Sequence, residues 1–287
     1  MPLLRSLRPR QWAKNTLVLT ALIFAGSATD PTSVARALAA MILFCAAASG
    51  LYLINDLSDV ERDRLHPSKR TRPIASGALA ASTARIAAVA LLGPSLVLGF
   101  LLSVPFGLTL AAYAVMTLAY SAGIKQVAIA DVFVLASGFV LRVVAGALVL
   151  DLAVSDWLLI CALQVSLFMA LCKRRHELGL LGGEAIEHRA ALAHYSPGLL
   201  DQMIAIITSA ILVSYSLYTL WPDTVAHVGS TRLKYSIPFV MLGVFRYLQL
   251  VYVKDEGGAP ERVLTDRGIV LIAVCWAASV AAVIYGH

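Results

Sequence analysis

Long apolar runs separated by short polar connectors account for nearly the whole chain. A transmembrane α-helix needs roughly 20 mostly apolar residues, and nine runs fit such a helix. They cover residues 16–29, 33–54, 82–103, 106–122, 127–150, 155–172, 199–221, 235–253 and 269–286. The pattern predicts an all-α integral membrane protein, a bundle of nine transmembrane helices, and we expect residues 1–287 to form a single domain.

Composition supports a membrane environment. Hydrophobic residues make up 59% of the chain and charged residues 14%, whereas soluble domains average about 45–50% and about 25%. Four basic residues precede the first run, but no convincing small-residue cleavage site follows it. We therefore expect a retained helix rather than a cleaved signal peptide.

The distribution of basic residues predicts the orientation of the bundle. With the N-terminus inside, nine spans place Arg36, Arg232 and Lys234 outside and Arg142 and Arg246 within the membrane, which leaves 18 of the 23 Lys and Arg residues on the inner side. Because basic connectors stay in the cytoplasm, the net charge of +6 reflects topology. The expected partners are the membrane, anionic lipids and anionic substrates, with no nucleic acid.

The connectors that can carry chemistry lie on that inner side. Three of them are long or dense in charge, at residues 55–81, 173–198 and 254–268. Irregular backbone is costly within lipid but tolerated above it, so we expect an active-site cap that faces the cytoplasm. The four Cys and six His residues show no CxxC or HExxH spacing, which argues against a disulfide and against zinc.

An acidic motif ends the second predicted span. On a helix, Asp56, Asp59 and Asp63 share one broad face with Asn55, and like charges at this spacing repel. Hard oxygen ligands suit Mg²⁺, which binds through one or two carboxylates together with substrate phosphates. The motif predicts that these four residues bind the metal and that the three carboxylates are catalytic. The alternative is a solvated helix end in which Arg62 and Arg64 pair with the acids.

A basic loop follows the acidic motif within ten residues. It contains Lys69 and Arg72, and such side chains neutralise the phosphate oxygens that a metal does not reach. The alternative is that this charge only sets the topology. The same choice applies to Lys173 and Arg174, which can share a helix face with Glu177.

Arg142 lies within a predicted span. A membrane-embedded Arg is a functional candidate by default because inserting it costs about 2.5–3.5 kcal/mol. The alternative is that it pairs with a carboxylate to hold the bundle together.

These motifs resemble the first signature of the UbiA-type prenyltransferase superfamily. The residues that carry the resemblance are Asn55-Asp56-x-x-Asp59-x-x-x-Asp63 and Lys69-x-x-Arg72-Pro73-Ile74. The resemblance implies a nine-helix membrane bundle with its active site on the cytoplasmic side, where the Asp-rich motif holds Mg²⁺ and a diphosphate leaving group.

Further motifs are similar to those of one branch of the superfamily, the decaprenyl-phosphate phosphoribosyltransferases. They are Arg8-Pro9-Arg10-Gln11-Trp12-x-Lys14-Asn15, His66-Pro67-x-Lys69-Arg70-x-Arg72-Pro73-Ile74, Tyr120-x-x-Gly123-x-Lys125 and Lys173-Arg174-x-x-Glu177-Leu178. The aromatic prenyltransferases of the superfamily have a second Asp-rich motif after the sixth span. This chain has the basic stretch Cys172-Lys173-Arg174-Arg175-His176-Glu177 there.

This resemblance implies a function. Members of the branch transfer 5-phosphoribose from 5-phosphoribosyl 1-diphosphate to a polyprenyl (decaprenyl) monophosphate in the bacterial plasma membrane, for the synthesis of cell-wall arabinan precursors. It implies a Mg²⁺-dependent transferase whose substrate-binding residues are Lys14, Lys69, Arg72, Tyr120, Lys125, Lys173, Arg174 and Glu177. We add Arg142 to the expected substrate-binding residues because of its predicted place within the membrane.

Two other functions remain open. The first is transfer of a prenyl group from a prenyl diphosphate to an aromatic or quinone-precursor acceptor. The second, a transporter with an acidic cation site, is less favoured because the acids lie at one face rather than near the midplane. The sequence leaves lipid length open, and homo-oligomer formation as well.

Overall fold

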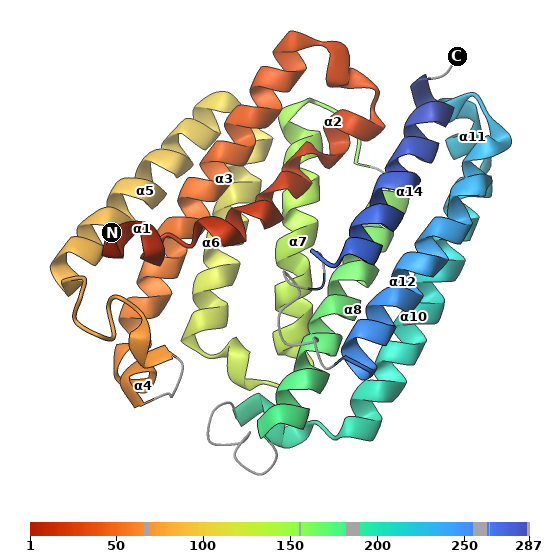
Figure 1. Cartoon of the computed structure of the whole chain (residues 1–287). Helices are drawn as coiled ribbons and strands as arrows, with labels where there is room; N and C mark the ends of the chain where they lie inside the picture. Colours follow the sequence, from red (N-terminus) through yellow and green to blue (C-terminus); the bar gives the residue numbers. More distant parts are fainter. Residues whose placement is uncertain (66–68, 155, 182–189, 255–262, 264, 286–287) are drawn as a thin grey trace. The chain divides into compact units, whose positions relative to one another are not determined.

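The computed structural model describes residues 1–65, 69–154, 156–181, 190–254, 263 and 265–285 (Figure 1). Within these ranges the regular structure is helical throughout. The chain divides into two compact units, Met1–Val154 (unit 1) and Ser155–His287 (unit 2). Each unit is described in turn.

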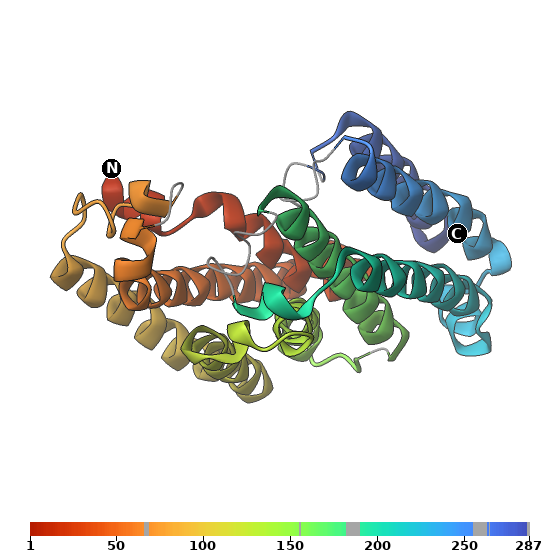
Figure 2. The same cartoon turned by 90° about the horizontal axis from the view of Figure 1, so that it is seen from below.

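Unit 1 begins with short helical segments and continues with long helices. In chain order these are α1 (Pro2–Ser6), η1 (Pro9–Leu19), α2 (Thr20–Phe24), η2 (Ser27–Thr29), α3 (Pro31–Ser58), α4 (Val60–Leu65), η3 (Lys69–Thr71), α5 (Ala81–Leu102), α6 (Val104–Ala122), η4 (Ile124–Gln126) and α7 (Ala130–Val149), where η denotes a 3₁₀ helix. Helix α3 packs along α5, α5 along α6 and α6 along α7 (Figure 2).

Unit 2 contains α8 (Asp156–Leu181), η6 (Ala190–His194), α10 (Pro197–Leu220), α11 (Pro222–Val228), η7 (Thr231–Ser236), α12 (Ile237–Tyr252) and α14 (Arg267–Tyr285). Helix α10 packs against α8 and α12, and α12 packs against α14. Proline occupies the first turn of α10, α11 and α12, where its missing N–H leaves no hydrogen bond unmade.

Seven of the nine predicted spans are long apolar helices in the described residues. They are α3, α5, α6, α7, α8, α10 and α14, and each extends to within a few residues of the predicted limits except at the end of α8. All seven are long and apolar enough to cross a membrane. The prediction of an all-α integral membrane protein is therefore confirmed.

The other two predicted spans differ from a single membrane-length helix. Residues 16–29 are divided among η1, α2 and η2, and Gly26 has a positive φ of 68° between the last two. In the region 235–253, α12 has 16 residues because η7 precedes it and Pro238 lies in its first turn. The count of apolar residues assumes one continuous α-helix, whereas these regions contain 3₁₀ segments with a larger rise per residue. Apolar length alone therefore did not predict the breaks.

The core of unit 1 joins α3, α6 and α7 to the N-terminal segment. Phe44 packs against Phe106 and Tyr113, with ring centroids 6.2 and 5.1 Å apart. Gly146 on α7 lies so close to η1 that an added Cβ would overlap the carbonyl of Val18. This contact fixes the N-terminal segment against the helices, and Figure 1 shows that segment crossing α3.

Candidate active site

The acidic motif occupies the junction between α3 and α4. Helix α3 ends at Ser58 and α4 begins at Val60. The backbone bond from Asp59 N–H to Asn55 O is 3.0 Å long, and the bond from Asp63 N–H to Asp59 O is 2.8 Å. Helical spacing therefore continues through the junction, although the predicted single helix is interrupted at Asp59.

One guanidinium bridges two of the carboxylates. Arg72 Nη1 donates to Asp56 Oδ1 at 3.0 Å and to Asp63 Oδ2 at 2.6 Å. Both Asp side chains are buried, and the Arg72 side chain is 28% exposed. A buried carboxylate needs a partner of opposite charge. Arg72, which follows α4 in the chain, supplies that charge to Asp56 of α3 and to Asp63 of α4 and so links these segments.

Arg8 is a second cation on Asp56, and the sequence did not assign it a role at the site. Its Nη2 lies 2.5 Å from Asp56 Oδ1, and its guanidinium lies 4.9 Å from the centre of the Tyr52 ring. Arg8 has a positive φ of 55° between α1 and η1. This backbone conformation is rare for residues other than glycine, and it cannot be predicted from the sequence motif that contains Arg8.

The third carboxylate is paired with a residue from a distant part of unit 1. Lys125 Nζ, in η4, lies 2.8 and 2.9 Å from the two oxygens of Asp59. The amide oxygen of Asn55 accepts a hydrogen bond from Ser121 Oγ at 2.9 Å. The structure thus brings the acidic motif, Arg72 and the connector after α6 together. Arg62 approaches Asp59 at 3.9 Å.

The side-chain chemistry suits a hydrated divalent cation bound together with phosphate. The motif offers carboxylate and amide oxygens, which are the ligands Mg²⁺ takes. In the described residues no group of three acidic, His or Cys side chains converges to hold a metal. The carboxylates of the motif contact Arg8, Arg72 and Lys125. These basic side chains balance the negative charge of the carboxylates, as a bound metal ion would.

The other candidate residues of unit 1 lie on nearby connectors or on the N-terminal segment. Lys69 begins η3, and its carbonyl accepts from the Arg72 N–H at 2.9 Å. Tyr120 lies in the last turn of α6, and Lys14 lies in η1. All three are partly buried and have partners. His66, Pro67 and Ser68 of the predicted basic loop lie outside the described residues.

Arg142 contacts no carboxylate in the part of the chain that the structure describes. It is buried within α7 and donates to Asn15 Oδ1 at 2.7 Å, to Gly138 O at 2.6 Å and to Tyr113 Oη at 2.9 Å. Its guanidinium lies 4.6 Å from the Tyr113 ring centre. Its partners in the described residues are neutral, so aromatic and hydrogen-bond contacts stabilise this buried cation. These contacts tie η1 to α6 and α7.

Unit 2 contains the remaining candidates at one end of α8. Arg174 is 1% exposed, and its Nη1 lies 2.6 Å from Glu177 Oε2. Lys173 is partly buried and has a partner. The next residue, Arg175, donates to Asp201 Oδ1 at 2.8 Å, and Tyr252 Oη donates to the same oxygen at 2.7 Å. This second group of contacts joins α8, α10 and α12 locally.

A further ion pair in unit 2 lies just before α14. Arg246 makes two contacts of 3.1 and 3.0 Å with the carboxylate of Asp266, which also accepts from the N–H groups of Gly268 and Ile269. The Arg246 side chain, by its hydrogen bonds above all, lowers the pKa of Asp266 to about 2. Asp266 therefore caps α14, and Arg246 has a structural partner.

The fold and the site define a class of protein: a polytopic helical membrane protein with a cluster of carboxylates and basic side chains at the end of a membrane-length helix. The family model of the UbiA prenyltransferase family matches residues 16–273. The chain belongs to this family.

Curated relatives match along almost the whole chain. A decaprenyl-phosphate phosphoribosyltransferase of Mycolicibacterium smegmatis is 36% identical, over 99% of this chain and 92% of the relative. One of Corynebacterium glutamicum is 35% identical, over 99% of this chain and 86% of the relative.

Solved structures agree in fold. A UbiA homologue from Archaeoglobus fulgidus, bound to DMAPP and Mg²⁺, superposes with a TM-score of 0.75 at 19% identity, covering 99% of both chains. The structure described as digeranylgeranylglyceryl phosphate synthase has a TM-score of 0.59 at 15% identity, covering 99% of this chain and 95% of the other. At these identities the likeness concerns the fold alone.

Proposed function

We propose that this protein transfers 5-phosphoribose from 5-phosphoribosyl 1-diphosphate to a polyprenyl (decaprenyl) monophosphate and releases diphosphate. The observation that carries the proposal is the pairing of Asp56, Asp59 and Asp63 with Arg8, Arg72 and Lys125. The carboxylates are groups that can bind a metal ion, and the basic side chains are groups that can pair with the oxygens of a diphosphate. The names of relatives with 35–36% identity over nearly the whole chain support the choice of substrates.

The acidic motif and the basic side chains have complementary roles in this proposal. Asn55, Asp56, Asp59 and Asp63 would hold Mg²⁺, which when bound supplies positive charge to the departing diphosphate. Arg72 and Lys125 would turn from the carboxylates to the phosphate oxygens, since a guanidinium or ammonium donates equally well to either. In the structure the same cations are paired with these acids.

The reaction requires little proton chemistry from the chain. A phosphate oxygen of the lipid forms a bond to the anomeric carbon of the ribose while the bond from that carbon to the diphosphate oxygen breaks. The electron pair of the broken bond leaves with the diphosphate. Because the lipid phosphate is already anionic at neutral pH, no general base is needed, and rate enhancement comes from positioning and charge stabilisation.

The basic residues outside the acidic motif would hold the remaining phosphates. The donor has a 5-phosphate as well as the diphosphate, so its site needs more positive charge than the site for a prenyl diphosphate. In this proposal Lys14, Lys69, Lys173 and Arg174 would contact the donor 5-phosphate and the lipid phosphate, and Tyr120 and Glu177 would make polar contacts. The contacts of Arg142 support a positioning role for it, because they fix the N-terminal segment that carries Arg8 and Lys14.

The proposal includes the topology. Nine membrane passages, two of them formed by the region of η1 to η2 and by the region of η7 and α12, would place the acidic motif and the basic connectors at the cytoplasmic face of the plasma membrane. The excess of Lys and Arg in the connectors on that side supports this orientation.

A two-donor assay tests the proposed function. Purified protein is supplied with Mg²⁺ and polyprenyl phosphate, and labelled phosphoribosyl diphosphate is compared with a prenyl diphosphate plus an aromatic acid. We expect label in the lipid fraction and diphosphate release only with the sugar donor. Release from the prenyl diphosphate, with no response to the sugar donor, would contradict the proposal and support prenyl transfer, the alternative function. Asp56→Asn protein serves as the inactive control.

A further inference from the structure

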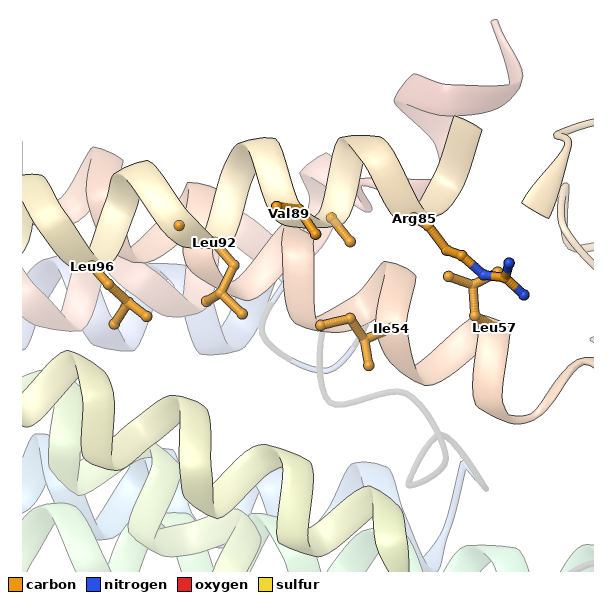
Figure 3. Close-up of a pocket in the computed structure, with 8 residues that line it drawn as sticks. Ile54, Leu57, Arg85, Val89, Leu92 and Leu96 are labelled. Atoms are coloured by element: carbon orange, nitrogen blue, oxygen red, sulfur yellow. The ribbon is translucent and has the colours of Figure 1, made fainter. Parts of the chain in front are cut away.

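A groove lies between α3 and α5, beside the end of α3 that carries the acidic motif. Figure 3 shows Leu57 of α3 beside Arg85 of α5 and Ile54 below Val89, with Leu92 and Leu96 further along α5, and all six line the groove. The groove has a volume of about 560 Å³, and Arg85 is its one charged lining residue. This volume lies within the roughly 300–1,000 Å³ typical of ligand sites.

The sequence of α5 explains the shape of the groove. Its lining positions, from Arg85 through Ala88, Leu92 and Leu96, recur every three or four residues and so form one helical face. Gly50 on α3 lets the two backbones approach closely, because an added Cβ would lie 3.0 Å from the Ala88 carbonyl oxygen. An added Cβ at Gly93 would meet nothing within 4 Å, so the groove is open at that position.

The groove faces the outside of unit 1 rather than its core. Val89 is 72% exposed, and α5 also exposes Ile86 and Leu101 strongly. Apolar surface of this extent on a membrane-length helix faces lipid. A lipid chain therefore fits the apolar part of the groove, and Arg85 adds a positive charge at one end of it.

Arg85 supplies charge where a lipid headgroup would lie. The residue is exposed and lies in the second turn of α5. Among the described residues it has neither a hydrogen-bond acceptor nor an acidic partner. The N-terminus of α5 has no side-chain cap, so its free N–H groups add partial positive charge at the same end. An anionic group fits this position and a zwitterionic one gains less there.

The length of the groove indicates which lipid it holds. Arg85 and Leu96 are 11 positions apart, which is about 16 Å along the helix axis, or about half of the hydrocarbon core of roughly 30 Å. One acyl chain within one leaflet has this reach. Asp56 points about 130° away from the direction midway between Ile54 and Leu57, so a headgroup at Arg85 does not lie on the face of α3 where the transfer is proposed.

We propose that this groove, defined by Ile54, Leu57, Arg85, Val89, Leu92 and Leu96, binds one chain of an anionic bilayer phospholipid whose phosphate headgroup contacts Arg85. The site is distinct from the acceptor site and does not depend on the proposed reaction. Because Ile54 and Leu57 flank Asp56 in the sequence, a bound chain supports the end of α3 from its lipid side.

Lipid retention tests the proposal without reference to turnover. The protein is purified in micelles with equal amounts of phosphatidylglycerol and phosphatidylcholine, washed, and its retained lipids are counted by native mass spectrometry. One basic side chain near a headgroup is worth about 1 kcal/mol, so we expect roughly fivefold preference for phosphatidylglycerol. Arg85→Gln should reduce the preference to about one, and Arg5→Gln, which removes another exposed cation of unit 1, should leave it unchanged.

A second variant separates the groove from the charge. Gly93→Leu fills open space and replaces a weak helix former, so the protein should fold and retain fewer lipids of both kinds. Ala90→Leu, on an exposed position outside the groove, is the matched control. Unchanged retention in Gly93→Leu would overturn the proposal. So would a loss of dimeric or larger species on filling the groove, which would mean that a second copy covers it, or displacement of phosphatidylglycerol by equimolar polyprenyl phosphate.

Discussion

The Arg72 bridge makes a quantitative prediction about the metal-free protein. Arg72→Gln removes the cation that contacts both Asp56 and Asp63. Breaking a fully buried ion pair costs about 3–5 kcal/mol, but Arg72 is 28% exposed, so solvent reduces the loss. We expect about 2 kcal/mol, the usual value for hydrogen bonds to a charged group, which lowers the thermal midpoint by roughly 4–8 °C.

The same variant should change how the protein responds to Mg²⁺. In the wild type the carboxylates are already paired, so we expect millimolar Mg²⁺ alone to shift the midpoint little and Mg²⁺ with diphosphate to shift it strongly. In Arg72→Gln, Asp63 loses its cation, and Mg²⁺ alone should restore most of the lost stability because a ligand that binds only the folded state stabilises it.

Thermal unfolding in detergent, with and without Mg²⁺ and diphosphate, measures both effects. Arg62→Gln is the matched control, because Arg62 is 71% exposed and lies 3.9 Å from Asp59, a geometry that contributes little. An equal response of wild type and Arg72→Gln to Mg²⁺ alone would refute the reasoning. It would mean that the arginine and the metal do not share the same carboxylates.

Three further predictions concern turnover, topology and acid stability. Asp56→Asn should lower turnover at least about a hundredfold, equivalent to roughly 2.7 kcal/mol of transition-state stabilisation, and EDTA should abolish it; near-normal rates would show that the ion-paired motif has only a structural role. Cysteines introduced at Arg70 and Thr231, both exposed, should react with impermeant reagent from the cytoplasmic and the outer side respectively, and the reverse labelling would overturn the orientation. The lowered pKa of Asp266 should add stability above the unfolded value of about 3.9 that is lost as pH falls toward about 2; an acid titration of Arg246→Gln should lack this dependence, and an unchanged profile would show that the ion pair does not cause it.

Most of the fold follows from apolar length. Runs such as 33–54 and 82–103 correspond closely to α3 and α5 because a helix satisfies its own backbone within lipid. The N-terminal region differs because side chains there bond to distant residues. Asn15 contacts both Cys45 and Arg142, and Trp12 donates to Ser49 at 3.0 Å. Tertiary contacts of this kind compete with regular α-helix and have no signature in local hydropathy.

The candidate site divides in the same way. The spacing of Asp56, Asp59 and Asp63 predicted that they share one helix face, because helical periodicity is a local property. It could not predict which basic residues pair with them. The distance between Lys125 and Asp59 depends on how α6 packs against α3, 66 positions earlier in the chain. Arg8 could not be assigned to the site from charge, since the sequence has several basic residues nearby, and its contact with Asp56 joins positions 48 residues apart in the chain.

The balance of charge at the end of α3 has a consequence for the order of binding. Three carboxylates there contact three well-placed cations, so a divalent metal arriving alone must displace basic side chains and leave them without acceptors. A diphosphate arriving alone would meet the carboxylates. In the proposed function the two ligands would exchange partners with the protein, because the metal would bind the acids and the phosphates would bind Arg8, Arg72 and Lys125. Joint binding would therefore leave both the acids and the bases with charged partners, and each ligand should raise the affinity for the other.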